Sequence, residues 1–200
     1  MVDEKHMLVK SNKNVLSFYK RGWDEDPNGR EFNKQYEIKL EEGDHYVANL
    51  ENILIFKRNA QMEVYSHIPM EIPADWPEAE RECYISLQAS HKNLVNCIKC
   101  SSFISEEYPT KVLLNEGLGF LFVATNRGNV KQYLWPLQSP TNPNPPAVFT
   151  QQVSCTRIIS LLLDAKYTFL YAISENGTIA QLAMRQFING LPMPYVYIIN

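Results

Sequence analysis

The residues best suited to metal or redox chemistry are the four cysteines, two of which form a C-x-x-C pair at Cys97 and Cys100. This spacing is typical of zinc ligands and of redox-active thiols. The surrounding segment, NLVNCIKCS, has the composition of a β-strand, in which residues three apart point to opposite faces. No second C-x-x-C follows, and His91 and Cys83 are not at zinc-finger spacing. We therefore expect Cys83, Cys97, Cys100 and Cys155 to be reduced, buried thiols with a structural role.

Groups that could perform catalysis are scattered along the chain. The sequence contains no G-x-S-x-G, P-loop, H-E-x-x-H or G-x-G-x-x-G motif. The acidic residues Asp24, Glu25 and Asp26 could attract a cation, but their spacing differs from that of an EF-hand loop, and a solvated loop is expected there. We therefore expect a protein without enzymatic activity, metal site or cofactor.

The composition indicates a packed globular protein. Of the 200 residues, 45% are hydrophobic and 12% aromatic, which argues against disorder. The net charge of −3 lacks the basic excess of nucleic-acid-binding modules. No apolar run approaches the length of about 18 residues that a membrane span needs, and the charged N-terminus has no secretory apolar region. We expect a cytoplasmic protein that binds neither nucleic acid nor membrane.

An internal repeat supplies the elements that position these residues. Four windows of similar pattern align, with large apolar residues at matching columns: 8–19, 54–65, 122–133 and 171–182. Their central column holds residues that tolerate the positive φ of a tight turn, with one weak member, Ala60; the column is Asn14, Ala60, Gly128 and Gly177. Each window is therefore predicted to be a β-hairpin.

The spacing of the hairpins predicts the fold. The windows start 46, 68 and 49 residues apart, and a period in the mid-forties is typical of a four-stranded propeller blade, with an insertion in the longer interval. Strand-like segments follow the hairpins at 34–40, 83–89, 147–153 and 195–199, and precede them at 45–50, 94–100 and 157–163. The prediction is an all-β propeller segment of about four four-stranded antiparallel blades over residues 1–200, without a helix. A generic sandwich or barrel remains the alternative.

The repeats resemble those of WD-repeat propellers. Ser90-His91, followed by Val95 and Ile98, resembles the family's glycine–histidine entry into an innermost strand. In the last repeat, the matching positions are Asp164, Leu170, Ser174, Gly177 and Ile179. No Trp-Asp pair closes a hairpin; the usual Trp is replaced by Tyr19, Tyr65, Tyr133 and Leu182, and the usual turn Asp by Asn12, Arg58, Asn126 and Glu175. The family's polar network is therefore not carried over to this chain.

A narrower resemblance covers the last two hairpins. LGFLFVATNRGNVKQYLWPL followed by IISLLLDAKYTFLYAISENGTI is similar to late blades of large cilia- and flagella-associated WD-repeat proteins. The matching residues are Gly119, Ala124, Thr125, Gly128, Pro136, Leu137, Asp164, Ser174, Glu175 and Gly177.

That resemblance implies a non-enzymatic scaffold of the ciliary or flagellar axoneme. Its partners would be proteins of a large axonemal assembly, such as inner-arm dynein or microtubule-associated proteins. A general intracellular adaptor, in trafficking or ubiquitin ligase assembly, is the alternative, and a propeller enzyme that uses its central channel is a further one. Proteins of this family are longer, so we expect the chain to be a segment of a larger propeller or to be completed by neighbouring chains.

Three loops are the candidate binding surfaces. Residues 20–32, 66–82 and 135–149 each separate a hairpin from the strand that follows, and the last two are rich in proline. Proline favours extended, pre-ordered segments, on which an aromatic side chain can anchor a partner. The candidate partner-binding residues are Trp23, Trp76, Trp135, Pro140, Pro143 and Pro145. The alternative is that each tryptophan folds back over its own blade.

Overall fold

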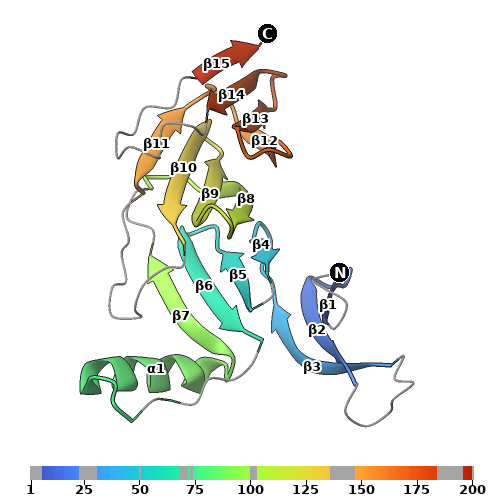
Figure 1. Cartoon of the computed structure of the whole chain (residues 1–200), viewed down its shortest axis with the longest axis vertical. Helices are drawn as coiled ribbons and strands as arrows, with labels where there is room; N and C mark the ends of the chain where they lie inside the picture. The colour runs from blue at the N-terminus through green and yellow to red at the C-terminus, as the bar shows by residue number, and fades with distance from the viewer. Residues whose placement is uncertain are drawn as a thin grey trace.

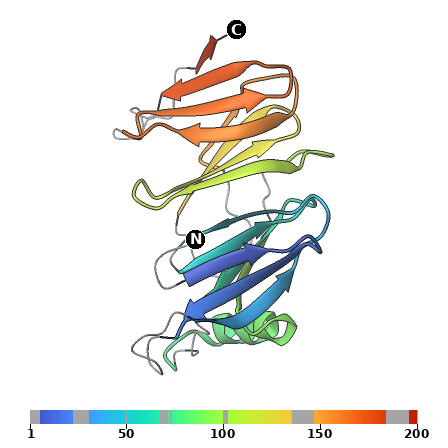
Figure 2. The same ribbon diagram turned by 90° about the vertical axis from the view of Figure 1, so that its right-hand side faces the viewer.

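Four antiparallel sheets stack along the long axis of the molecule (Figures 1 and 2). The computed structural model describes residues 6–22, 31–49, 51–67, 72, 74–99, 103–135, 147–183 and 196–199. Within these residues there are fifteen strands and one helix, and within each sheet the strands that are consecutive in sequence pair with each other. The predicted propeller-blade architecture is confirmed.

Each sheet is one blade, numbered here from the N-terminus. Blade 1 holds β1 (His6–Lys10), β2 (Val15–Arg21) and β3 (Phe32–Lys39). Blade 2 holds β4 (His45–Ala48), β5 (Asn52–Phe56), β6 (Gln61–Ser66) and β7 (Leu94–Lys99). Blade 3 holds β8 (Pro109–Asn115), β9 (Phe120–Thr125), β10 (Asn129–Leu134) and β11 (Phe149–Gln152). Blade 4 holds β12 (Ile158–Leu163), β13 (Phe169–Ser174), β14 (Ile179–Ala183) and β15 (Val196–Ile199).

The core consists of three apolar layers, one between each pair of successive blades. Strand β5 shows how the sequence builds two of them. Ile53 and Ile55 face blade 1, whereas Leu54 and Phe56 face blade 3, because successive side chains of a strand point to opposite faces. A strand that is buried on both faces has a continuous run of apolar residues, as the segment NILIF has.

The hairpin turns have the backbone conformation that their residues predict. Asn14, Ala60, Gly128 and Gly177 have φ of 55°, 64°, 75° and 84°, so the positive φ expected of this column is confirmed, including at the weak member. Glycine is required on steric grounds at Gly128. A Cβ built there would lie 2.0 Å from the backbone oxygen of Ser154.

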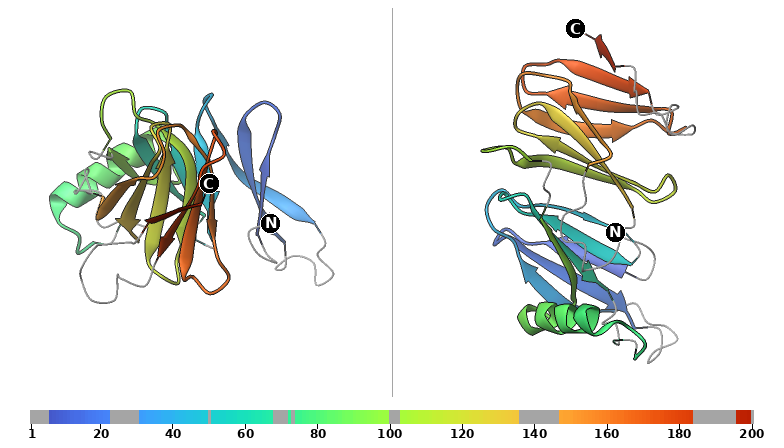
Figure 3. Two further views of the ribbon diagram at one scale, coloured as in Figure 1. Left: turned by 90° about the horizontal axis from the view of Figure 1, so that it is seen from above. Right: turned by 90° about the vertical axis from the view of Figure 1, so that its left-hand side faces the viewer.

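The structure corrects the prediction of an all-strand chain in blade 2. Residues 83–89, expected to form a strand, belong to helix α1 (Glu78–Ser90), which lies beside β7 at the opposite end of the molecule from blade 4 (Figures 1 and 3). The helix also takes the end of the loop predicted at 66–82. The residues EAERE directly after Pro77 are mostly strong helix formers and start the helix. Tyr84 and Ile85, which favour strands, continue it.

The strand order around this helix also differs from the prediction. Residues 94–99 form the outermost strand of blade 2, not the innermost strand of blade 3. That inner strand is β8, which the sequence did not reveal because it begins at Pro109. His91 caps the C-terminal end of α1, so its likeness to the glycine–histidine entry was wrong. The long interval between hairpins reflects residues 67–93, inserted between β6 and β7.

Candidate functional site

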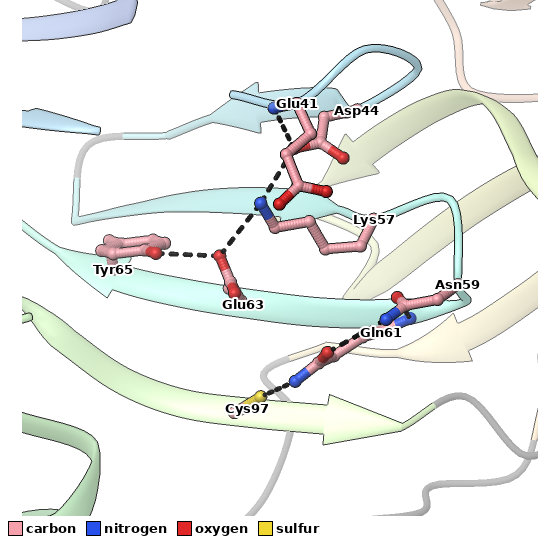
Figure 4. Close-up of polar contacts among 8 residues, drawn as sticks. All are labelled: Glu41, Asp44, Lys57, Asn59, Gln61, Glu63, Tyr65 and Cys97. Carbon is pink, nitrogen blue, oxygen red and sulfur yellow. Dashed lines mark hydrogen bonds and ion pairs between the residues drawn. The ribbon is translucent and has the colours of Figure 1, made fainter. Parts of the chain in front are cut away.

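An ion cluster ties the approach to β4 to the hairpin of blade 2. Lys57 Nζ lies 2.9 Å from Asp44 Oδ2 and 3.8 Å from Glu63 Oε2. The hydroxyl of Tyr65 donates to Glu63 over 2.8 Å, and the backbone N–H of Glu41 donates to Asp44 over 2.8 Å. Figure 4 shows Lys57 between the two carboxylates. Because the side chain of Asp44 is only 1% exposed, the cluster belongs to the interior of the blade.

The electrostatics of this cluster fix its protonation. Burial acts to lower the pKa of Lys57, but the hydrogen bond to Asp44 and the negative charges of Glu63, Asp44 and Glu41 outweigh it, and the pKa is raised. Burial, followed by the charge of Glu63, raises the pKa of Tyr65. Lys57 therefore stays charged and Tyr65 neutral near pH 7. The arrangement suits positioning of the hairpin better than proton transfer.

The cysteines occupy three different environments. The side-chain amide of Gln61 donates to Cys97 Sγ, and burial above all raises the pKa of that thiol, which lowers its reactivity. Cys83 is half-buried on α1, whereas Cys155 is exposed, so the expectation of a buried thiol is wrong at Cys155. Cys100 lies outside the described residues. In the part of the chain that the structure describes, no three His, Cys, Asp or Glu side chains gather in a way that could hold a metal ion.

A second buried ion pair lies in blade 3. Lys131 Nζ is 3.1 Å from Glu107 Oε2, and the two side chains are 3% and 0% exposed. Glu107 also accepts hydrogen bonds from the side chain of Asn129 at 2.7 Å and from the backbone N–H of Ile104 at 3.1 Å, while Lys131 lies 5.0 Å from the ring centroid of Phe103. Burial acts to raise the pKa of Glu107, but these hydrogen bonds outweigh it and lower the pKa.

The two ion pairs have a common arrangement within their blades. Asp44 and Glu107 both lie shortly before an innermost strand, and each holds a lysine that lies within or just after the central strands of its blade. Sequence reasoning recorded the absence of the tryptophan and aspartate typical of WD repeats but missed these ion pairs. The available signal was an acidic residue shortly before an inner strand, together with a lysine in an otherwise apolar hairpin.

The inner strands bring basic residues together. Strand β4 lies against β8, and β8 against β12. Burial lowers the pKa of His45 on β4, and the positive charges of Lys111 on β8, Arg157 before β12 and Lys10 on β1 lower it further, while the negative charge of Asp44 acts in the opposite direction. Basic side chains from three other blades thus act on His45, a convergence that spacing along the chain did not predict.

Two arginines in the hairpin turns make local contacts. Arg58 lies over the ring of Tyr108, 4.8 Å from its centroid, and Arg127 lies 3.4 Å from Glu106. Both pairs join the turn of a hairpin to the segment that leads into β8. They support the packing of blades 2 and 3 rather than a converging set of catalytic groups.

The two candidate tryptophans that the structure describes both contact their own chain. Trp76 is half-buried and meets Tyr84 of α1 edge-on, with ring centroids 5.7 Å apart. Trp135 is half-buried against the core layer between blades 2 and 3, and its backbone N–H donates to Gly119 over 2.8 Å. The other candidates lie outside the described residues: Trp23, Pro140, Pro143 and Pro145. Partner binding by any of the six residues stays a prediction. Within the described residues, no helix has the length and apolar character needed to cross a membrane.

Comparisons with known proteins place this geometry among propellers. No family model matches the sequence, and no curated protein matches it. Among solved structures, the chain is similar to Chaetomium thermophilum Raptor, with a TM-score of 0.61 and 13% identity over 99% of this chain and 16% of that one. It is also similar to the β-propeller domain of Myceliophteria thermophila Cps50 (Swd1), with a TM-score of 0.55 and 10% identity over 97% of this chain and 55% of that one.

A third similar structure contains a bound segment. Chaetomium thermophilum Sqt1, solved with the N-terminus of the ribosomal protein L10, matches with a TM-score of 0.58 and 12% identity over 91% of this chain and 43% of that one. The chain thus spans between 16% and 55% of the structures it matches. Identities this low establish the fold alone, and that fold is a set of WD-repeat-type β-propeller blades.

Proposed function

We propose that the chain is a non-enzymatic scaffold that binds other proteins through its loops and blade edges. The observation that carries the proposal is that the buried charged side chains are paired with each other inside the blades. Lys57 and Lys131 are held in ion pairs within their own blades, where they fix the approach to an inner strand. Rigid blades of this kind hold surface segments at fixed spacing. The bound L10 segment of the Sqt1 structure supports protein partners for this fold.

The finer proposal is an axonemal setting. It is supported by the resemblance of residues 118–179 to late blades of cilia- and flagella-associated proteins. The partners would be axonemal proteins such as microtubule-associated proteins or inner-arm dynein, and the location the cytoplasm of the cilium or flagellum. The same blades would suit an adaptor in trafficking or ubiquitin ligase assembly. The localisation of the protein distinguishes such an adaptor from an axonemal scaffold.

Cross-linking in the native source, combined with microscopy of the tagged chain, tests both the scaffold function and the axonemal setting. Amine-reactive reagents reach the exposed Lys13, Lys92 and Lys166, whereas Lys131 is buried. We expect ciliary signal and cross-links to axonemal proteins. Lys92→Arg keeps the charge, removes one reactive amine and verifies assignments at that position. Stable partners in a diffuse cytoplasmic pool would contradict the axonemal setting alone, and a chain without any protein cross-link would contradict the scaffold.

A further inference from the structure

Blade 2 carries two cysteines on elements that pack against each other. Cys83 belongs to helix α1 and Cys97 to the outermost strand, β7, and both side chains are half-buried. The helix lies beside this strand (Figures 1 and 3). The face of each element on which its cysteine stands decides whether the two thiols meet.

Cys83 lies on the inner face of α1. The side chains of this helix that are buried or half-buried belong to Glu80, Cys83, Tyr84, Leu87 and Gln88. Their spacing of three and four residues is that of a single helix face. Leu87, one turn after Cys83, packs against the core layer between blades 1 and 2. The Cys83 side chain is therefore turned toward the blade.

Cys97 lies on the side of blade 2 that this helix covers. It stands opposite Glu63 of β6, and Glu63 stands opposite Ile55 of β5, which faces blade 1. Residues directly opposite each other in a sheet share a face, so Cys97 is also turned to the blade 1 side. Leu87 places α1 on that same side. Cys83 and Cys97 therefore point into one junction between helix and sheet.

The two cysteines also lie equally far from the turn that joins their elements. The N–H of Leu94, the first residue of β7, donates to the carbonyl of His91 at the end of α1 over 2.8 Å. Cys83 precedes the end of the helix by about 10 Å, and Cys97 follows the start of the strand by about 10 Å. Burial contributes most to the raised pKa of Cys97, and the charges of Glu63 and Cys83 add to it. The two sulfur atoms are thus near enough for their charges to interact.

We propose that Cys83 and Cys97 form a reversible disulfide that fixes α1 to β7, by exchange with a small disulfide such as oxidised glutathione. The Cys83 thiolate attacks one sulfur of the small disulfide and displaces a first thiolate, which leaves a mixed disulfide on Cys83. The Cys97 thiolate then attacks the Cys83 sulfur and displaces a second thiolate. The two cysteines together lose two electrons, and the two released thiolates take up their protons.

The surroundings of Cys97 suit the second of these steps. Its raised pKa keeps the thiolate scarce, which disfavours a first attack on a molecule from solution. The side-chain amide of Gln61, which Figure 4 shows against the sulfur, donates to Cys97 and stabilises the thiolate when it forms. The disulfide would also hold Trp76 in place, because its ring packs on Tyr84 of the helix. Oxidation would therefore act on one of the candidate partner-binding residues.

Peptide mapping of the full chain tests the disulfide. Trypsin separates Cys83, Cys97 and Cys100 into fragments 82–92, 93–99 and 100–111. The folded chain is exposed to oxidised glutathione, the remaining thiols are blocked with iodoacetamide, and the digest is read by mass spectrometry. We expect fragment 82–92 joined to fragment 93–99, and dithiothreitol should release the two.

Two serine variants provide the matched comparison. Cys83→Ser should abolish the joined fragments, whereas Cys155→Ser, which removes an exposed thiol, should keep them. Oxidation should raise the Tm of the wild type by about 5 °C, because the link closes a loop of about 15 residues. It should leave the Tm of Cys83→Ser unchanged. Circular dichroism of the reduced variants confirms that both are folded.

Three results would overturn the proposal. Fragment 93–99 joined to 100–111 would show that Cys97 pairs with Cys100 instead. Glutathione retained on Cys83, without any joined fragments, would show that Cys97 does not reach it. Joined fragments found only in a covalent dimer would show that the two thiols meet between chains and do not fix the helix to its own blade.

Discussion

The ion pair of Lys131 and Glu107 brings two unit charges into the interior of blade 3. The Glu107 side chain is fully buried, and its carboxylate also accepts hydrogen bonds from Asn129 and the backbone of Ile104. Removing charges from water is costly, and a buried pair offsets that cost only when its hydrogen bonds are satisfied. Loss of one partner is therefore more damaging than loss of both.

Lys131→Met should lower the free energy of unfolding by about 3–5 kcal/mol, because it leaves the Glu107 carboxylate buried without its cation. The double variant Lys131→Met/Glu107→Gln should recover part of that loss, since the amide carries no charge. Urea unfolding of the three proteins measures both effects. The control is Lys34→Met, which breaks a pair with Glu37 whose side chains are both 49% exposed, and should cost less than about 1 kcal/mol. A double variant less stable than Lys131→Met would refute this account of the pair.

Helix α1 is the element that distinguishes blade 2 from its neighbours. Tyr84 is 1% exposed and packs under Trp76, and Leu87 reaches the core layer between blades 1 and 2. Ile85, next in sequence to Tyr84, is 55% exposed. The helix is therefore held to the blade by one face, and the two adjacent residues provide a matched test of that packing.

Tyr84→Ala should lower the free energy of unfolding by about 3 kcal/mol, because it removes a fully buried ring from under Trp76. Ile85→Ala should change it by less than about 0.5 kcal/mol. Chemical denaturation followed by tryptophan fluorescence and by circular dichroism measures both. Equal effects of the two substitutions would mean that the helix does not use the Tyr84 face for packing.

The elements differ in how far the sequence could predict them. Hairpins such as the one around Asn176-Gly177 were predictable, because strand composition, turn residues and the repeat agree there. The segment 83–89 was misread because Tyr84 and Ile85 favour strands, while the helix is set by the preceding glutamates. The sequence showed an acidic residue before β8 and a lysine in an apolar hairpin, but not that Lys131 and Glu107 pair, because they lie 24 positions apart and meet only in the folded blade.

At the scale of the whole molecule, no described element covers the outer face of blade 4. Leu170 and Ala172 of β13 point into the layer shared with blade 3, so the alternate residues Tyr171 and Ile173 point away from it. Leu162 pairs with Tyr171 on this face and is 52% exposed. An apolar sheet face of this kind favours association.

The chain in isolation should therefore associate as its concentration rises, and Leu162→Lys should weaken that association. A charge at this position would have to be buried on contact, which is unfavourable without a partner. Sedimentation velocity over a range of concentrations measures the effect. Tyr167→Lys, at a turn position that is also 52% exposed, is the matched control and should leave association unchanged. Equal sedimentation of the wild type and Leu162→Lys would show that this face does not drive association.

The pairing of consecutive strands within each blade has a consequence for synthesis of the chain. Contacts between sequence neighbours form quickly, and chains emerge from the ribosome N-terminus first. Blades 3 and 4 can each close their sheet as soon as their fourth strand leaves the exit tunnel. Blade 2 must wait for residues 67–93 to pass before β7 can join β6. Its three earlier strands therefore present an unpaired edge during translation, and α1 is made in time to cover β7 as that strand arrives.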